Sequence, residues 1–256
     1  MKGLLVVSLL LTLLGAPARA AGSIAIAAAA DLKFAMDEIV ADFRSAHPGD
    51  DVSVIYGSSG KFHTQIQNGA PFDIFFSADI AYARSLLQNG SAASEPVLYA
   101  VGRIVLWSGA LDAARMTLEN LVDPHIRRIA IANPKHAPYG RAAEEALKAE
   151  DVWNRLQGRL VFGENVAQTA QYARTGAADV AIIALSLVLS PELKGKGSYS
   201  EIPENLYAPL RQAFVVTKRG GNNPLAETFA KFMASPAARR VMIRYGFVLP
   251  GETAQK

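Results

Sequence analysis

The chain has 256 residues, a formal net charge of +3, an apolar fraction of 50% and no cysteine. Its length allows one large domain or two smaller ones, and its apolar fraction is sufficient for a sizeable core. The charges are mixed along the sequence without a basic tract, which argues against a nucleic-acid partner. The lack of cysteine excludes thiol catalysis and cysteine-ligated metals.

The first twenty residues have the layout of a secretory signal peptide. Lys2 supplies the positive n-region, an almost unbroken apolar run covers residues 4–14, and Ala18-Arg19-Ala20 has the small residues of an A-x-A cleavage site. The apolar run is shorter than the roughly 20 residues that a membrane-spanning helix needs. We therefore expect cleavage after Ala20 and export to the periplasm, which leaves a mature chain with a charge near +1.

The next part of the chain alternates short apolar runs with helical periodicities. The apolar run of residues 24–30 predicts a buried strand, and it leads directly into Asp31 and a set of apolar residues at helical spacing up to Phe43. Further strands are predicted at 52–56 and 74–77, and further helices at 61–68 and 81–88. Strand–turn–helix units in series predict a mostly parallel sheet with helices on both faces.

The same alternation starts again after a strand predicted at residues 104–107. We expect further strands at 129–132, 160–162, 180–185 and 213–217, and helices at 140–149, 166–174 and, as one helix or a pair, 224–245. Two similar α/β halves predict two lobes. No Pro/Gly/Ser-rich linker separates them, so the chain should cross between the lobes on strands. We expect lobe I to comprise residues 21–103 and 201–256, and lobe II residues 104–200.

No catalytic constellation or metal site is apparent in the sequence. The histidines lack the spacing of metal ligands; they are His47, His63, His125 and His136. Neither a G-x-S-x-G elbow nor a phosphate-binding Walker loop is present. We therefore expect no enzymatic activity, no metal and no cofactor.

Four strand ends with small residues lead directly into helices. They lie at Ala30-Asp31, Ser58-Ser59-Gly60, Pro138-Tyr139-Gly140 and Asn165-Val166. In open α/β sheets the carboxyl ends of strands face the ligand crevice, and each helix start offers unpaired N–H groups and the positive end of the helix dipole. Taken singly, each junction is consistent with ordinary capping, with Asp31 and Asn165 as N-cap residues. Together, in an exported protein, they favour an anion-binding cleft.

At these residues the sequence resembles the family of periplasmic molybdate-binding proteins (ModA), over essentially the whole mature chain. The most specific parts are Ala27–Met36 (AAAADLKFAM), Tyr56–Lys61 (YGSSGK) and Asn68–Asp79 (NGAPFDIFFSAD). Similarity extends to Tyr99–Ser108 (YAVGRIVLWS), Asn133–Gly140 (NPKHAPYG) and Tyr245-Gly246-Phe247. These are long, ordered matches, which are more specific than any single short motif.

The resemblance implies a type II periplasmic solute-binding fold, with two lobes joined by hinge strands. It also implies that backbone N–H and hydroxyl donors hold the oxyanion in the cleft without a metal. Carried over by position, the ligand-binding residues are Ala30, Asp31, Ser59, Tyr139 and Val166. Some members have a tyrosine where this chain has Ala184, and Tyr139 is expected to supply that hydroxyl instead.

Asp31 is the main departure from the family, whose members carry serine, or threonine and asparagine, at positions 30 and 31. A carboxylate roughly 4 Å from a dianion would weaken binding by about 4 kcal/mol at an effective dielectric constant near 20. We therefore expect the Asp31 side chain to cap its own helix while its N–H group faces the ligand. Alternatively, the carboxylate accepts a proton from the ligand, which would favour hydrogen phosphate over molybdate.

The leading hypothesis is an exported binding protein that captures molybdate or tungstate, closes over it and docks, as a monomer, on an inner-membrane ABC permease. One alternative is a protein for another oxyanion, such as sulfate or phosphate. A second is a periplasmic hydrolase of anionic esters, for which the histidine nearest to Ser59 in sequence is His63. A third is the ligand-sensing domain of a regulator; the export signal and the lack of a helix-turn-helix segment argue against it.

Overall fold

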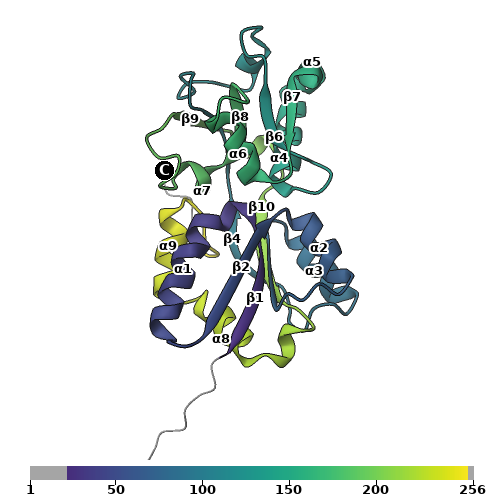
Figure 1. Ribbon diagram of the computed structural model, residues 1–256. Helices are drawn as coiled ribbons and strands as arrows, with labels where there is room; N and C mark the ends of the chain where they lie inside the picture. Colours follow the sequence, from purple (N-terminus) through teal and green to yellow (C-terminus); the bar gives the residue numbers. More distant parts are fainter. Residues whose placement is uncertain (1–21, 253–256) are drawn as a thin grey trace, which may run out of the picture.

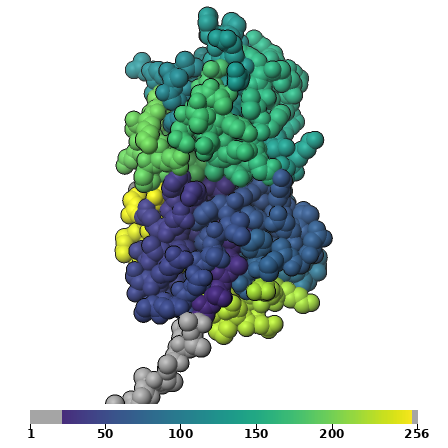
Figure 2. Space-filling view, viewed as in Figure 1, coloured from purple at the N-terminus to yellow at the C-terminus, as the bar shows by residue number. Residues whose placement is uncertain are grey.

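Two five-stranded sheets organise the chain into two lobes, one above the other (Figure 1). The computed structural model describes residues 22–252, so the predicted signal peptide at residues 1–20 lies outside the described part. The space-filling view in Figure 2 shows the lobes in contact along a seam between the purple and blue first lobe and the green second lobe. The predicted two-lobed α/β fold is therefore confirmed.

The sheet of the first lobe has the strand order β2-β1-β3-β10-β4. β1 pairs in parallel with β2 and β3, whereas β10 runs antiparallel to β3 and β4. Small and apolar residues fill β1, and its last four residues are buried because helices cover both faces of the sheet. The strands are β1 (Ser23–Ala29), β2 (Asp51–Gly57), β3 (Ile74–Ser77), β4 (Val97–Gly102) and β10 (Leu210–Val216).

The helices of the first lobe form two cores, one on each face of this sheet (Figure 1). α1, α8 and α9 bury aromatic and aliphatic side chains on one face, and α2 and α3 do so on the other. The helices are α1 (Lys33–Ala46), α2 (Ser59–Gln67), α3 (Ile80–Gln88), α8 (Pro224–Phe232) and α9 (Pro236–Arg244); short 3₁₀ turns are η1 (Ala30–Leu32) and η5 (Gly220–Asn222).

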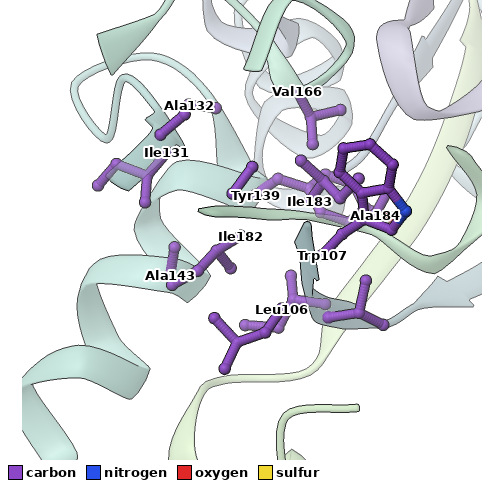
Figure 3. Packing of buried hydrophobic residues seen from close by; sticks show 14 of the residues in the cluster. Leu106, Trp107, Ile131, Ala132, Tyr139, Ala143, Val166, Ile182, Ile183 and Ala184 are labelled. Carbon is purple, nitrogen blue, oxygen red and sulfur yellow. The ribbon is translucent and has the colours of Figure 1, made fainter. Parts of the chain in front are cut away.

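The sheet of the second lobe has the strand order β7-β6-β8-β5-β9. Figure 3 shows its core, in which Tyr139 and Val166 lie beside Ile183 and Ala184. The strands are β5 (Ile104–Ser108), β6 (Ile129–Ala132), β7 (Leu160–Gly163), β8 (Val180–Ala184) and β9 (Ser198–Glu201). The helices are α4 (Pro138–Ala149), α5 (Trp153–Leu156), α6 (Val166–Arg174) and α7 (Leu185–Val188), with 3₁₀ turns η2 (Glu119–Val122), η3 (Gln157–Arg159) and η4 (Glu204–Leu206).

The first passage between the two sheets runs from strand to strand, as expected, whereas the return includes η4. β4 ends at Gly102 in the first sheet and β5 begins at Ile104 in the second, so one residue separates the two. The return runs from β9 to β10. The carboxyl ends of β1, β2 and β3 lie close to the second lobe (Figure 1).

Among the predicted helices, α2 and α4 begin two residues earlier than the sequence pattern indicated. α2 begins at Ser59 rather than Lys61, because Ser58 acts as its N-cap. α4 begins at Pro138 rather than Gly140, since proline is well suited to the first turn of a helix. Both shifts place Ser59 and Tyr139 in the first turn of a helix. The sequence pattern also missed β4 and β9, and none of the described helices is both long and apolar enough to cross a membrane.

Candidate functional site

A small cavity lies at the seam between the lobes, and the five predicted ligand-binding residues all line it. Ala30, Asp31 and Ser59 belong to the first lobe, and Tyr139 and Val166 to the second. About 10 Å³ of the cavity is open to the centre of a water molecule, which is roughly the room that one water needs. The structure therefore brings together segments that are up to 136 residues apart in the sequence.

Ser59 directs a hydroxyl group toward this cavity from the first turn of α2. Its side chain is buried, with an exposed fraction of 1%. The Oγ atom accepts a hydrogen bond from the N–H group of Ala78 at 3.0 Å. Because that bond uses the acceptor side of the hydroxyl, the hydroxyl hydrogen is free to donate to a ligand.

Val166 is the first residue of α6 and contributes the start of that helix. Asn165 caps the helix: its side-chain oxygen accepts from the N–H groups of Ala167 and Gln168, both at 3.0 Å. The predicted N-cap role of Asn165 is thereby confirmed. The cap does not use the N–H group of Val166, which leaves this donor for an anion at the helix start.

Tyr139 lies in the first turn of α4 and reaches across the seam. Its hydroxyl donates to Asp31 Oδ2 at 3.0 Å and accepts from Gln212 Nε2, also at 3.0 Å. Burial raises the pKa of the Tyr139 phenol well above its ordinary value, and the nearby Asp31 carboxylate raises it further. Tyr139 is therefore a neutral hydrogen-bond donor at physiological pH.

The expectation that the Asp31 side chain caps its own helix is wrong. Residues 30–32 form a 3₁₀ turn, α1 begins only at Lys33, and no side chain caps either element. Asp31 therefore lies inside the first turn rather than at the N-cap position. Its carboxylate points into the seam, where Oδ2 accepts from Tyr139 Oη and, at 2.8 Å, from Gln212 Nε2. Its Oδ1 atom is buried and has no hydrogen-bonding partner.

The surroundings of Asp31 disfavour its charged form. Burial raises the pKa of the Asp31 carboxyl to about 6, and the hydrogen bonds from Gln212, from Tyr139 and from the backbone N–H groups of Asp31 and Leu32 offset only part of this rise. No lysine, arginine or histidine within residues 22–252 contributes to the pKa of this group. Asp31 is thus a carboxylate held by neutral donors alone.

Sequence reasoning missed Gln212, Tyr99 and Gly102, which surround Asp31 and Tyr139. Tyr99 Oη donates to Gln212 Oε1 at 2.7 Å, so the amide is oriented with its NH₂ group toward Asp31. A Cβ atom on Gly102 would lie 2.2 Å from the Tyr139 hydroxyl, so only glycine leaves room for this cluster. The available signal was a glutamine inside an apolar strand, because a polar residue buried there needs a partner.

The rim of the seam carries further contacts between the lobes. Lys61 Nζ lies 2.5 Å from Glu164 Oε1, and Arg141 Nη2 lies 2.5 Å from Asp79 Oδ2. The N–H group of Gly60 donates to the carbonyl of His136 at 2.9 Å. These contacts hold α2 and the start of α3 against the second lobe.

The nucleophile–base pair that a hydrolase would need between Ser59 and His63 is not formed. His63 Nε2 contacts Ser85 Oγ at 3.0 Å instead. Ser58 does contact His136 Nδ1 at 2.9 Å, but its hydroxyl donates to the His136 carbonyl and its oxygen caps α2. Among the described residues, no group of three or more His, Cys, Asp or Glu side chains is placed to hold a metal ion.

Comparisons with known proteins give a consistent result. Residues 24–248 match a family described as bacterial extracellular solute-binding protein. The molybdate-binding protein ModA of Rhodobacter capsulatus is 37% identical over 231 residues, which cover 90% of this chain and 89% of that protein. ModA of Azotobacter vinelandii is 36% identical over 249 residues, which cover 96% of this chain and 97% of that protein.

Solved structures agree with this result. The periplasmic molybdate-binding protein of Azotobacter vinelandii superimposes with a TM-score of 0.82 at 32% identity, over 89% of this chain and 99% of that one. The sulfate-binding protein SubI from Mycobacterium tuberculosis superimposes with a TM-score of 0.71 at 15% identity, over 90% of this chain and 88% of that one. At that identity, the likeness extends to the fold alone.

Proposed function

Because this chain belongs to the family of bacterial extracellular solute-binding proteins, we propose that it captures molybdate or tungstate between its lobes for an ABC importer. The observation that carries the proposal is the convergence of donors from both lobes on one seam cavity, in a chain 37% identical to a molybdate-binding protein. Neutral donors of this kind suit a tetrahedral oxyanion.

Binding would proceed by closure of the lobes around the anion. The hydroxyl of Ser59 lies in the first lobe and the N–H group of Val166 in the second, whereas Tyr139 lines the cavity from the second lobe with its hydroxyl hydrogen donated to Asp31. An anion that contacts donors of both lobes stabilises the closed form relative to the open form. Four anion oxygens need more room than one water molecule, so the lobes must sit slightly further apart around a bound anion than they do here.

The proposal also covers the localisation, the oligomeric state and the partner of the protein. We propose a periplasmic monomer, exported by a signal peptide cleaved after Ala20, that delivers its ligand to an inner-membrane permease and catalyses no reaction. We also propose that residues 21–103 move as one lobe together with a C-terminal segment, with the segment between them as the other lobe. The expected boundary at residue 201 falls in β9 of the second sheet, so we place the return to the first lobe between η4 and β10. The strand that ends at Gly102 and the strand that begins at Ile104 support this division.

The panel of candidate ligands tests the proposal directly. The mature protein is titrated with molybdate, tungstate, sulfate and phosphate, with calorimetry and thermal unfolding as readouts. Molybdate and tungstate should bind and raise the Tm, since a ligand that binds only the folded state stabilises it. Sulfate should have a smaller effect or none. A shift produced by phosphate alone, or by a carbohydrate alone, would contradict the assignment.

A further inference from the structure

The two oxygens of the Asp31 carboxylate have different environments, although both belong to a side chain that is 1% exposed. Oδ2 accepts two hydrogen bonds, from Tyr139 Oη at 3.0 Å and from Gln212 Nε2 at 2.8 Å. Oδ1 is buried without a partner. The residue lines the same cavity as Ser59 and Val166. A buried oxygen without a partner is costly, so Oδ1 needs either a donor or a proton of its own.

The cluster behind Asp31 determines which oxygen can carry that proton. Tyr99 Oη donates to Gln212 Oε1 at 2.7 Å, so the amide presents its NH₂ group to Asp31 Oδ2. The reverse orientation would place an amide oxygen against a carboxylate oxygen. Since Oδ2 already accepts two donors, a proton on the carboxyl group resides on Oδ1.

Within the described part of the chain, none of the groups that face Asp31 carries a positive charge that could neutralise its carboxylate. The titratable ones are the phenols of Tyr139 on α4 and Tyr99 on β4, and burial raises the pKa of both well above the ordinary value. Gln212 on β10 and Ser186, which donates to the Asp31 carbonyl at 2.8 Å, are neutral. An ionised Asp31 would therefore face a bound dianion without a counter-charge, and the two would repel each other.

We propose that Asp31 meets the oxyanion as a carboxylic acid and donates a hydrogen bond from Oδ1, so that capture of each anion takes up one proton from water. This inference rests on the proposed function of the seam. It makes Asp31 a specificity-determining residue, because an acid at this position needs an acceptor. Fully deprotonated anions such as molybdate offer an acceptor on every oxygen. Hydrogen phosphate, whose own hydroxyl needs an acceptor, fits such a donor less well.

The titration of Asp31 is consistent with this assignment. Burial in the closed seam raises its pKa to about 6, and a dianion beside it would raise the pKa further. Between the two values the free protein is ionised and the complex is protonated. Linkage then requires the dissociation constant to rise about tenfold for each unit of pH in that interval.

The test measures proton uptake directly. Mature protein is titrated with molybdate at about pH 7.5 in two buffers with different ionisation enthalpies, and the difference in observed heat gives the number of protons taken up. Dissociation constants are then measured from about pH 6.5 to 8.5, above the free pKa of Asp31. We expect uptake of about one proton and binding about 100-fold weaker at the upper pH.

Asp31→Asn supplies the matched comparison, since its amide NH₂ donates at every pH. It should show no proton uptake and a flat pH profile. Asp42→Asn makes the same chemical change at an exposed position of α1 and should retain the wild-type profile. The two-buffer measurement on the wild type needs no variant, so it decides the question even if Asp31→Asn fails to fold.

The outcomes separate this inference from the proposed function. Molybdate binding with no proton uptake, or an equal pH slope in Asp31→Asn, overturns the role of Asp31 and leaves the function intact. Binding of neither molybdate nor tungstate at any pH overturns both. Tight phosphate binding that Asp31→Asn weakens overturns both as well, because Asp31 would then be the acceptor of a ligand proton.

Discussion

The rim and the centre of the seam join the same two lobes with different chemistry. At the rim, Lys61 pairs with Glu164 through side chains that are 53% and 39% exposed. At the centre, Asp31 and Tyr139 meet with exposed fractions of 1% and 3%, and their third partner, Gln212, is fully buried. The rim contact is an ion pair in water, whereas the centre is a carboxylate among neutral donors.

This difference predicts how each region responds to change. Exposed ion pairs contribute about 0–1 kcal/mol each, and salt screens them. A buried polar group that loses its partner costs about 1–3 kcal/mol, because water cannot replace the lost bond. Changes at the centre should therefore have large effects that depend on pH, and changes at the rim small effects that depend on ionic strength.

The largest effect is expected from Asp31→Asn on the stability of the anion-free protein. Because the folded-state pKa of Asp31 is raised from 3.8 to about 6, its contribution is fully present below about pH 4 and is lost as the pH rises through 6. The loss amounts to about 3 kcal/mol and is absent in the asparagine variant. Urea unfolding of both proteins from about pH 4 to 7.5 measures it. Parallel stability curves for the two proteins would contradict the raised pKa.

Ser59→Ala tests whether the hydroxyl group of Ser59, which lines the seam cavity, donates a hydrogen bond to the anion. Loss of one hydrogen bond to a charged ligand should cost about 1.5–3 kcal/mol, which weakens molybdate binding about 10- to 150-fold. Ser45→Ala removes an exposed hydroxyl on α1 that bonds only to its own helix, so it should leave the dissociation constant unchanged. Equal dissociation constants for Ser59→Ala and the wild type would show that this turn is only structural.

Gly102→Ala tests whether the buried cluster needs the space that glycine leaves. The added methyl group would lie 2.2 Å from the Tyr139 hydroxyl and 2.6 Å from Gln212 Nε2. Overpacking of this kind destabilises the fold by about 1–3 kcal/mol, and it should weaken molybdate binding because it displaces Tyr139 and Gln212 from Asp31. Gly158→Ala is the control, because its Cβ atom meets no other atom within 4 Å. Undisturbed binding by Gly102→Ala would show that the cluster tolerates displacement.

The smallest effect is expected from Lys61→Ala at the rim. Removal of its ion pair with Glu164 should weaken molybdate binding by about 0.2–1 kcal/mol, and the effect should disappear at high salt. Lys148→Ala removes a pair with Glu144 inside α4 that does not join the lobes, so it should not alter affinity. A loss for Lys61→Ala that persists at high salt would mean that the rim contributes more than screened attraction.

The sequence by itself determined the two-lobed α/β class and the segments that form the seam. Alternating strands and helices follow from local periodicity, and helix starts follow from residues such as Asn165, whose side chain bonds to its own next turn. Such features involve neighbours in the chain, so a single sequence contains the information needed to predict them.

Only the tertiary structure decided how the Asp31 side chain is directed. A capping role depended on the position at which α1 begins, and after the 3₁₀ turn the residue before α1 is Leu32 rather than Asp31. Its partners Tyr139 and Gln212 are 108 and 181 residues away, on elements of different lobes. These residues come together only through the packing of the two sheets, which no local sequence pattern encodes. The free energy of burying the Asp31 carboxylate also depends on every group around it, so it cannot be judged from the sequence.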